Sequence, residues 1–241
     1  MGNRIRIDKF LSDMNMGTRS EIKELIRKGR VKINGNPCAK PDEKVDTGTD
    51  TVSLDGQLIP YEKYIYLMLN KPAGVVSATK DTREKTVTDL IKNSRKDIFP
   101  VGRLDKDTEG LLILTNDGLL AHNLLSPKKE VDKVYYARVE GRVTEKDAKA
   151  FLSGISIGEG EICLPAKLEI LSSGEISEVR LTIQEGKFHQ VKRMFEAVGK
   201  KVIYLKRISM GGLMLDPALK PGDYRSLTDD EIAYLKKITN R

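Results

Sequence analysis

The segment that most constrains how this chain can fold is Gly102–Leu112, which reads GRLDKDTEGLL. Gly102 and Gly110 interrupt regular structure on either side of a polar loop that contains Asp105. An uninterrupted apolar run, Leu111–Leu114, follows directly and is typical of a buried strand. The sequence therefore predicts a shaped loop that holds a carboxylate at the entrance to a buried strand.

Length and composition indicate a globular protein. The 241 residues suffice for one large domain or for a small domain and a medium one. Hydrophobic residues make up 39% and charged residues 32%, and no run of about 18 apolar residues predicts a transmembrane helix. The charged N-terminal ten residues do not resemble a secretory signal. Two cysteines, Cys38 and Cys163, cannot form a disulfide framework, which favours a cytoplasmic location.

The charge and the ligand-type residues narrow the chemistry. The formal net charge of +7 suits a polyanionic partner without proving one. His122, His189 and the two cysteines offer no pair at the spacing of metal ligands. Neither a phosphate-binding glycine loop nor a Gly-x-Ser-x-Gly motif is present. We therefore expect any chemistry to proceed without a metal ion or cofactor.

The first 60 residues are expected to form a compact unit. Asp8 is predicted to cap a first helix, and Thr18 with Glu21 has the spacing of a capping box for a second. Asn-Gly and Asp-Gly pairs are strong hairpin signals. The expected elements are helices over 8–14 and 18–28, a strand over 30–33, and hairpins that turn at 34–35 and 55–56.

Six cations gather on the second helix and directly after it: Arg19, Lys23, Arg27, Lys28, Arg30 and Lys32. The first three lie four residues apart and share one helical face. The last two follow Gly29, where helical phase no longer predicts their direction. Spacing alone is equally consistent with a solvated basic face and with a nucleic-acid-binding face.

The remaining chain mixes strands and helices without strict alternation, which predicts an α+β fold with a mixed, mainly antiparallel sheet and flanking helices. Asp107 is expected to be a turn acceptor, and Asp117-Gly118 a hairpin turn. The predicted strands cover 64–70, 75–78, 111–115, 134–140, 168–172, 179–184 and 201–206. The predicted helices cover 86–93, 144–152, 186–198 and 228–238.

The stretch Gly102–Asp105, continued through Thr115–Gly118, resembles the catalytic motif of pseudouridine synthases, in particular the RsuA/RluB branch. The resemblance implies that Asp105 is a nucleophile, which attacks either ribose C1′ or uracil C6. It also implies a cofactor-free reaction that breaks the bond between C1′ and uracil N1, turns the base and rejoins C1′ to C5. Because burial would raise the pKa of the carboxyl, a cationic partner is expected.

Lys133–Tyr136, which reads KVYY, resembles the second motif of the same family. The resemblance implies that Tyr135 stacks on the target uracil, with its hydroxyl available for proton transfer. Tyr136 should point to the opposite face of its strand. Without the resemblance, both rings would be interpreted as aromatic residues that pack a sheet.

The stretch 185–194, which reads EGKFHQVKRM, resembles the third motif. It implies that Lys192 is the cationic partner of Asp105, with Arg193 as the alternative because helix phase decides between neighbours. His189, Gln190 and Arg193 are expected to contact RNA, with packing as the alternative role of His189. The resemblance implies that Arg103 helps to hold the target nucleotide out of its stack, while a structural salt bridge is the alternative role.

The run Arg27–Gly35 resembles the S4 RNA-binding module, and this resemblance covers most of residues 3–59. It implies that the six cations contact RNA phosphates. Asn70–Gly74 resembles the opening of the synthase domain, where it is expected to form a structural turn. The expected domains are therefore an S4-type domain over 1–60 and a pseudouridine synthase domain over 61–241.

Stretches 122–128 and 192–195 resemble the RsuA-like group, which implies a uridine of small-subunit (16S) ribosomal RNA as the target. Large-subunit (23S) RNA is the alternative, as is a non-catalytic RNA-binding protein of the same fold. A carboxylate-dependent hydrolase would need a second catalytic acid and fits the basic charge poorly. We expect ribosomal RNA or a pre-ribosomal particle as the partner, no membrane, no required protein partner and a monomer.

Overall fold

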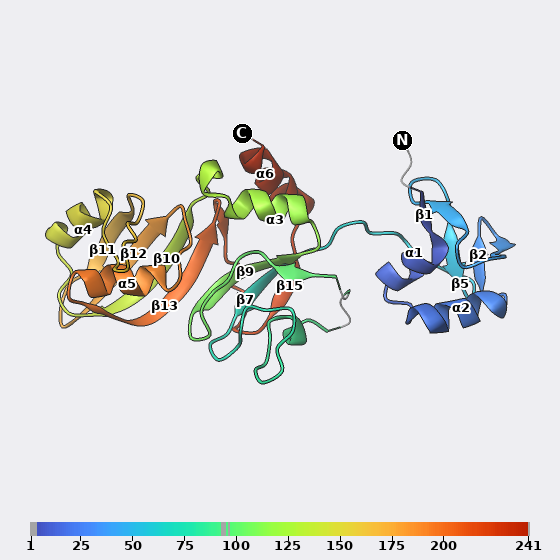
Figure 1. Cartoon of the computed structure of the whole chain (residues 1–241), viewed down its shortest axis with the longest axis horizontal. Helices are drawn as coiled ribbons and strands as arrows, with labels where there is room; N and C mark the ends of the chain where they lie inside the picture. Colours follow the sequence, from blue (N-terminus) through green and yellow to red (C-terminus); the bar gives the residue numbers. More distant parts are fainter. Residues whose placement is uncertain (1–3, 93–94, 96, 241) are drawn as a thin grey trace. The chain divides into compact units, whose positions relative to one another are not determined.

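The structure is a computed structural model that describes residues 4–92, 95 and 97–240 (Figure 1). These residues form two compact units, each built from two segments: Met1–Tyr64 with Lys92–Ile98, and Ile65–Ile91 with Phe99–Arg241. Within the first unit, Arg95 donates to the carbonyl of Glu62 (2.6 Å) and pairs with Asp97 (2.6 Å). The first unit therefore contains a short segment that lies beyond the sequence-predicted boundary at residue 60.

The first unit packs two helices against short strands. Its helices are α1 (Ile7–Asp13) and α2 (Arg19–Arg27). One sheet has the order β3-β2-β5-β6, with strands Asn36–Pro37, Val31–Ile33, Val52–Leu54 and Gln57–Leu58, and β1 (Arg4–Arg6) pairs separately with β4 (Lys44–Asp46). The core is apolar and includes Ile7, Phe10, Leu11, Ile22, Ile26 and Val31.

The two helix starts in this unit differ from one another. Thr18 and Glu21 form the predicted capping box at the start of α2, which is confirmed. The predicted cap at Asp8 is wrong, because α1 begins at Ile7 and Asp8 lies in its first turn. The Asp8 carboxylate instead accepts hydrogen bonds from Arg6 Nε (3.0 Å) and Nη2 (2.8 Å).

The second unit is built on a mixed sheet with the strand order β11-β12-β10-β13-β9-β7-β15. All of these neighbours pair antiparallel except β9 and β13, which are parallel, so the predicted mainly antiparallel sheet is confirmed. In that order the strands span Lys167–Ser172, Ile176–Ile183, Lys133–Glu140, Lys201–Met210, Glu109–Thr115, Tyr66–Lys71 and Tyr224–Ser226. Two short strands extend it, β8 (Phe99–Pro100) beside β9 and β14 (Leu213–Met214) beside β13.

Four helices flank this sheet (Figure 1). Helices α3 (Gly118–Leu125) and α6 (Asp229–Thr239) lie beside one another and share an apolar core with β7 and β9. Helix α4 (Glu145–Leu152) packs on β11, and α5 (Gln190–Ala197) packs on β13. Phe151 and Phe195 join α4 to α5 through an edge-on ring contact. No helix among the described residues is long and apolar enough to cross a bilayer.

Three local predictions are wrong. Instead of a helix over 86–93, the described residues contain only the short 3-10 helix Thr88–Leu90, and Asn93 lies outside them. The expected strand over 75–78 is reduced to a single bridge between Val76 and Thr86. Asp117 is the N-cap of α3 and not part of a hairpin turn, because its carboxylate accepts hydrogen bonds from Leu120 N and from the Tyr66 hydroxyl.

Gly110 lies where the parallel strands β9 and β13 meet. Its φ is +100°, and a Cβ at this position would lie 2.2 Å from the carbonyl oxygen of Arg207. A backbone atom cannot move aside as a flexible side chain can. The second glycine of the Gly102–Leu112 segment therefore permits the strand contact that joins the two antiparallel parts of the sheet.

We predict that Gly110→Ala lowers the free energy of unfolding by about 3 kcal/mol or more, because strain at positive φ adds to a backbone clash. Gly222→Ala is a matched control, since its φ is +94° but a Cβ there meets nothing within 4 Å. That control should cost about 1–2 kcal/mol. Urea unfolding followed by circular dichroism measures the free energy of unfolding of both variants. Equal decreases in the two variants would show that the strands shift to accommodate the extra methyl group and that no clash remains.

Candidate active site

Asp105 lies in the loop that leads into β9. Buried Ser77 fixes the backbone just before it, donating to the carbonyl of Leu104 (2.8 Å) and accepting from its N–H (3.0 Å). Lys71 fixes the backbone at and after Asp105. The Asp105 side chain is 26% exposed, so the loop presents its carboxylate without burying it completely.

Lys71 is a fully buried organiser of this loop. Its ammonium donates to four backbone carbonyls, those of Pro72, Asp105, Lys106 and Thr108, at 2.8–3.2 Å. Burial lowers the pKa of Lys71 to about 8. The sequence predicted only a structural turn at Asn70–Gly74, and no pattern in the sequence indicates that the lysine of this turn holds the Asp105 loop.

Lys192, on the first turns of α5, faces this carboxylate. Its Nζ lies 3.2 Å from Asp105 Oδ2 and 2.7 Å from Asp107 Oδ1. Burial acts to lower the pKa of Lys192, but the hydrogen bond to Asp107 and the charge of Asp105 raise it above its ordinary value. Asp107 lies in the turn at 106–107, and its carboxylate also accepts hydrogen bonds from Lys192, which the expected role as a turn acceptor did not include.

Tyr135 lies on β10 with its side chain 8% exposed, directly opposite Arg207 of β13. Tyr136 points to the other face of the sheet, where its ring meets Tyr204 edge-on with centroids 6.1 Å apart. This alternation follows from the two-residue period of a strand. Of these two tyrosines, Tyr135 is therefore the one whose side chain can reach Asp105.

Asp105 and Tyr135 line two adjoining cavities. The smaller, of about 70 Å³, is also lined by Thr108, Val191 and Lys192. The larger, of about 590 Å³, extends from the same two residues to Arg103, Lys106, Leu125 and Phe188. A volume of this size falls within the usual range for a small-molecule or nucleotide site.

Arg103 is exposed at the larger cavity, and within the described residues it makes no hydrogen bond or ion pair. The structure therefore provides no salt bridge for the structural role considered for this arginine. Its guanidinium is available to a ligand that enters the cavity.

His189 and its neighbour Phe188 also line the larger cavity. His189 has φ of 49° at the start of α5, and its ring stacks on Phe188 with centroids 3.8 Å apart. His189 Nε2 lies 3.7 Å from Asp105 Oδ1. Phe188 is 75% exposed and was not singled out from the sequence, although an exposed aromatic next to this motif is a usable signal for base stacking.

Two other residues of the third motif are bound by protein groups. Gln190 lines the smaller cavity and is 4% exposed, and its side-chain amide is bound to Glu185 (2.9 Å) and to the backbone N–H of Lys187 (2.9 Å). Its expected contact with RNA stays a prediction. Arg193 binds Glu161 (2.6 Å) and not Asp105, because one helical step turns its side chain away.

The six cations of the first unit divide into two groups of three. The paired trio is bound within the unit: Arg27 and Lys28 to Glu24 at 2.7 and 3.4 Å, and Arg30 to Asp55 through Nε at 2.7 Å. The unpaired trio consists of Arg19, Lys23 and Lys32, which are exposed and have no such partner in the described residues.

We predict that replacing the unpaired trio by Gln weakens RNA binding more than the same change in the paired trio. Carboxylates already offset the charge of the paired trio, so fewer counterions are released there when RNA binds. For the unpaired trio, the slope of log K against log salt should fall by about 0.7–0.9 per lost phosphate contact. Filter binding between 50 and 300 mM salt measures both, and identical slopes would contradict this division.

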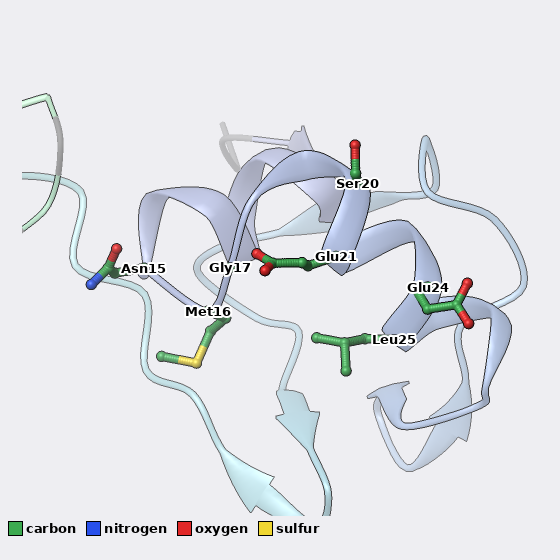
Figure 2. A pocket seen from close by; sticks show the side chains of 7 residues that line it. All are labelled: Asn15, Met16, Gly17, Ser20, Glu21, Glu24 and Leu25. Carbon is green, nitrogen blue, oxygen red and sulfur yellow. The ribbon is translucent and has the colours of Figure 1, made fainter.

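The first unit also has a hollow of about 640 Å³ between the end of α1 and α2 (Figure 2). Met16 and Leu25 form its apolar lining, and Glu21 and Glu24 its acidic lining. Both carboxylates are already used, Glu21 in the capping box and Glu24 against Arg27. No candidate catalytic residue lines this hollow. Across the described residues, no group of three His, Cys, Asp or Glu side chains could hold a metal ion.

Comparisons with known proteins agree with this geometry. The RNA pseudouridylate synthase family matches residues 65–197, and the S4 domain family matches residues 5–51. The uncharacterized RNA pseudouridine synthase YtzG of Bacillus subtilis is 48% identical over 97% of this chain and 99% of its own. A solved structure described as a pseudouridylate synthase is 38% identical, covers 96% of this chain and 99% of its own, and superposes with a TM-score of 0.68.

Two further relatives carry more specific names. The ribosomal large subunit pseudouridine synthase B of Bacillus subtilis is 41% identical over 98% of this chain and 97% of its own. The ribosomal small subunit pseudouridine synthase A of Vibrio cholerae is 40% identical over 97% of this chain and 100% of its own. The extent of these matches and the arrangement of the Asp105 loop lead to one conclusion: this chain belongs to the RNA pseudouridine synthase family and carries an N-terminal S4 domain.

Proposed function

We propose that this enzyme converts a specific uridine of ribosomal RNA to pseudouridine, with Asp105 as the nucleophile and without a cofactor. One observation carries the assignment: Asp105 lines both cavities together with Tyr135, and its carboxylate lies 3.2 Å from the Lys192 ammonium. A carboxylate is an adequate nucleophile for either ribose C1′ or uracil C6.

The surrounding residues take separate roles in this proposal. Lys192 holds the Asp105 carboxylate in position through their ion pair. Tyr135 stacks on the uracil ring, and its hydroxyl takes part in moving the C5 proton. Arg103 engages the RNA that surrounds the flipped nucleotide and offsets part of the few kcal/mol that unstacking costs.

Small-subunit ribosomal RNA is the first candidate substrate, because stretches 122–128 and 192–195 resemble the RsuA-like group. Large-subunit RNA is the second candidate, since the relative with that name is as similar as the small-subunit one, at 41% against 40% identity. Ribosomal RNA, alone or in a pre-ribosomal particle, is the only partner that the proposal requires, and the cytoplasm is the corresponding location.

Tritium release from uracil-5-labelled ribosomal RNA tests the proposal, because the C5 proton leaves as C5 joins C1′. Wild-type protein is incubated in parallel with naked small-subunit RNA, naked large-subunit RNA and the corresponding immature particles. We expect release from one RNA species only, to the extent of one or a few equivalents per RNA. Tight RNA binding without release from any of the four substrates would contradict the proposed reaction and leave a binding protein.

A further inference from the structure

Two cations lie buried in the wall of the larger cavity without a carboxylate partner. Lys133, the first residue of β10, is 4% exposed, and Arg207 of β13 is 3% exposed. Lys133 Nζ donates to the carbonyl of Gln184 (3.0 Å), and Arg207 Nε donates to the carbonyl of Leu111 (2.8 Å). Among the described residues, neither side chain forms an ion pair, and Arg207 Nη2 has no hydrogen-bond partner at all.

Such an arrangement costs stability by itself. Buried charges in proteins are normally paired, and two like charges in a medium of low polarity repel one another. Burial, and then the charge of Arg207, lower the pKa of Lys133 to about 8, so this lysine is still mostly charged at neutral pH. Because this buried pair of cations is unfavourable for folding and lies in the wall of a cavity, we consider it suited to bind an anionic ligand.

The strand register places this pair next to the reacting groups. Arg207 lies directly opposite Tyr135 across β10 and β13, and Lys133 precedes Tyr135 by two residues. Residues two apart on a strand, and residues opposite one another on neighbouring strands, share a face of the sheet. Consistently, all three side chains line the cavity that also contains Asp105.

Depth distinguishes this pair from the other cations of the cavity. Arg103 and Lys106 are exposed and Lys187 is half-buried, whereas Lys133 and Arg207 are almost completely buried. A base that is turned out of its stack reaches further into a cavity than the phosphates that flank it. Lys133 and Arg207 are therefore suited to bind the base, and the exposed cations are suited to bind the phosphates.

We infer that Lys133 and Arg207 form a subsite for the uracil ring while the ring carries negative charge, an inference that rests on the proposed function. If C1′ is attacked, the C1′–N1 bond breaks and its electron pair stays on the ring, spread over N1, O2 and O4. If C6 is attacked instead, the charge extends over C5 and O4. In both cases the ring oxygens become strong acceptors. The ring is neutral again when C5 has bonded to C1′, Asp105 has left as a carboxylate, and N1 has gained a proton in place of the one that C5 loses.

The test compares Lys133→Met, Lys133→Arg and wild type on a synthetic RNA that spans the uridine located by the tritium assay. Lys146→Met on the exposed face of α4 is the matched control, since it removes one positive charge outside the cavity. Single-turnover conversion, RNA affinity by filter binding and thermal unfolding are measured for each. Each variant is also tested on the same RNA with 5-fluorouridine at the target position, because 5-fluorouracil bears a negative charge more easily than uracil. The reaction on this RNA is measured as the loss of 5-fluorouridine.

We expect Lys133→Met to slow conversion of uridine by about 10²-fold, as for loss of one donor to a developing anion, while RNA affinity changes by less than about threefold. Lys133→Arg should recover most of the rate. The loss should be clearly smaller with 5-fluorouridine, a dependence that a merely structural role would not produce. Equal losses on both RNAs, a parallel loss of affinity, or an unchanged rate would overturn the inference. No conversion by wild type would instead overturn the proposed function, and this inference with it.

Discussion

Asp105→Asn should abolish pseudouridine formation, with the rate of conversion reduced by about 10⁴-fold or more, as expected when a covalent nucleophile is lost. The amide matches the carboxylate in size, so the loop held by Lys71 and Ser77 should keep its shape. The side chain is 26% exposed, so its loss of charge should have little effect on the free energy of unfolding. RNA affinity should stay equal or rise, because a negative charge leaves a site for a polyanion.

Asp107→Asn is the matched control for this experiment. Asp107 is only two residues away, and Lys192 lies closer to it than to Asp105, at 2.7 Å against 3.2 Å. Because the Asp107 side chain is 71% exposed, its replacement should change the rate by less than about tenfold. Tritium release and single-turnover conversion compare the two variants. If Asp107→Asn were inactive and Asp105→Asn active, Asp107 and not Asp105 would be the nucleophile.

Lys192→Met should slow conversion by about 10²–10³-fold while RNA affinity falls by less than about tenfold. Without the ammonium, Asp105 loses the positively charged group that lies 3.2 Å from its carboxylate and helps to hold it in position. Lys192→Arg should restore much of the rate.

The comparison of rate with affinity decides what Lys192 does. Equal losses of rate and of RNA affinity would mark Lys192 as a phosphate contact. Arg193→Met provides the neighbouring control, because Arg193 is bound to Glu161 and lies off the site. Arg193→Met should lower the stability of the α5 region more than it lowers the rate of conversion.

The local elements were largely predictable from the sequence because their signals are local. The capping boxes at Thr18 and Thr228 involve residues three positions apart, and both are present. The Asn34-Gly35 and Asp55-Gly56 turns join paired strands as predicted. Asp8 and Asp117 were misassigned because an acidic residue near a helix start or before a glycine is compatible with several local structures, and neighbouring side chains decide among them.

The sequence by itself determined the family, the motifs and the identity of Asp105, Tyr135 and Lys192 as candidates, because a contiguous pattern of residue types carries that information. Only the tertiary structure decided which cations are paired, since ion pairs such as Arg30 with Asp55 join residues far apart in the chain. The same holds for Lys71 beneath the Asp105 loop and for the buried pair of Lys133 and Arg207. Burial and charge balance depend on which strands and helices meet, and a linear pattern does not contain those distances.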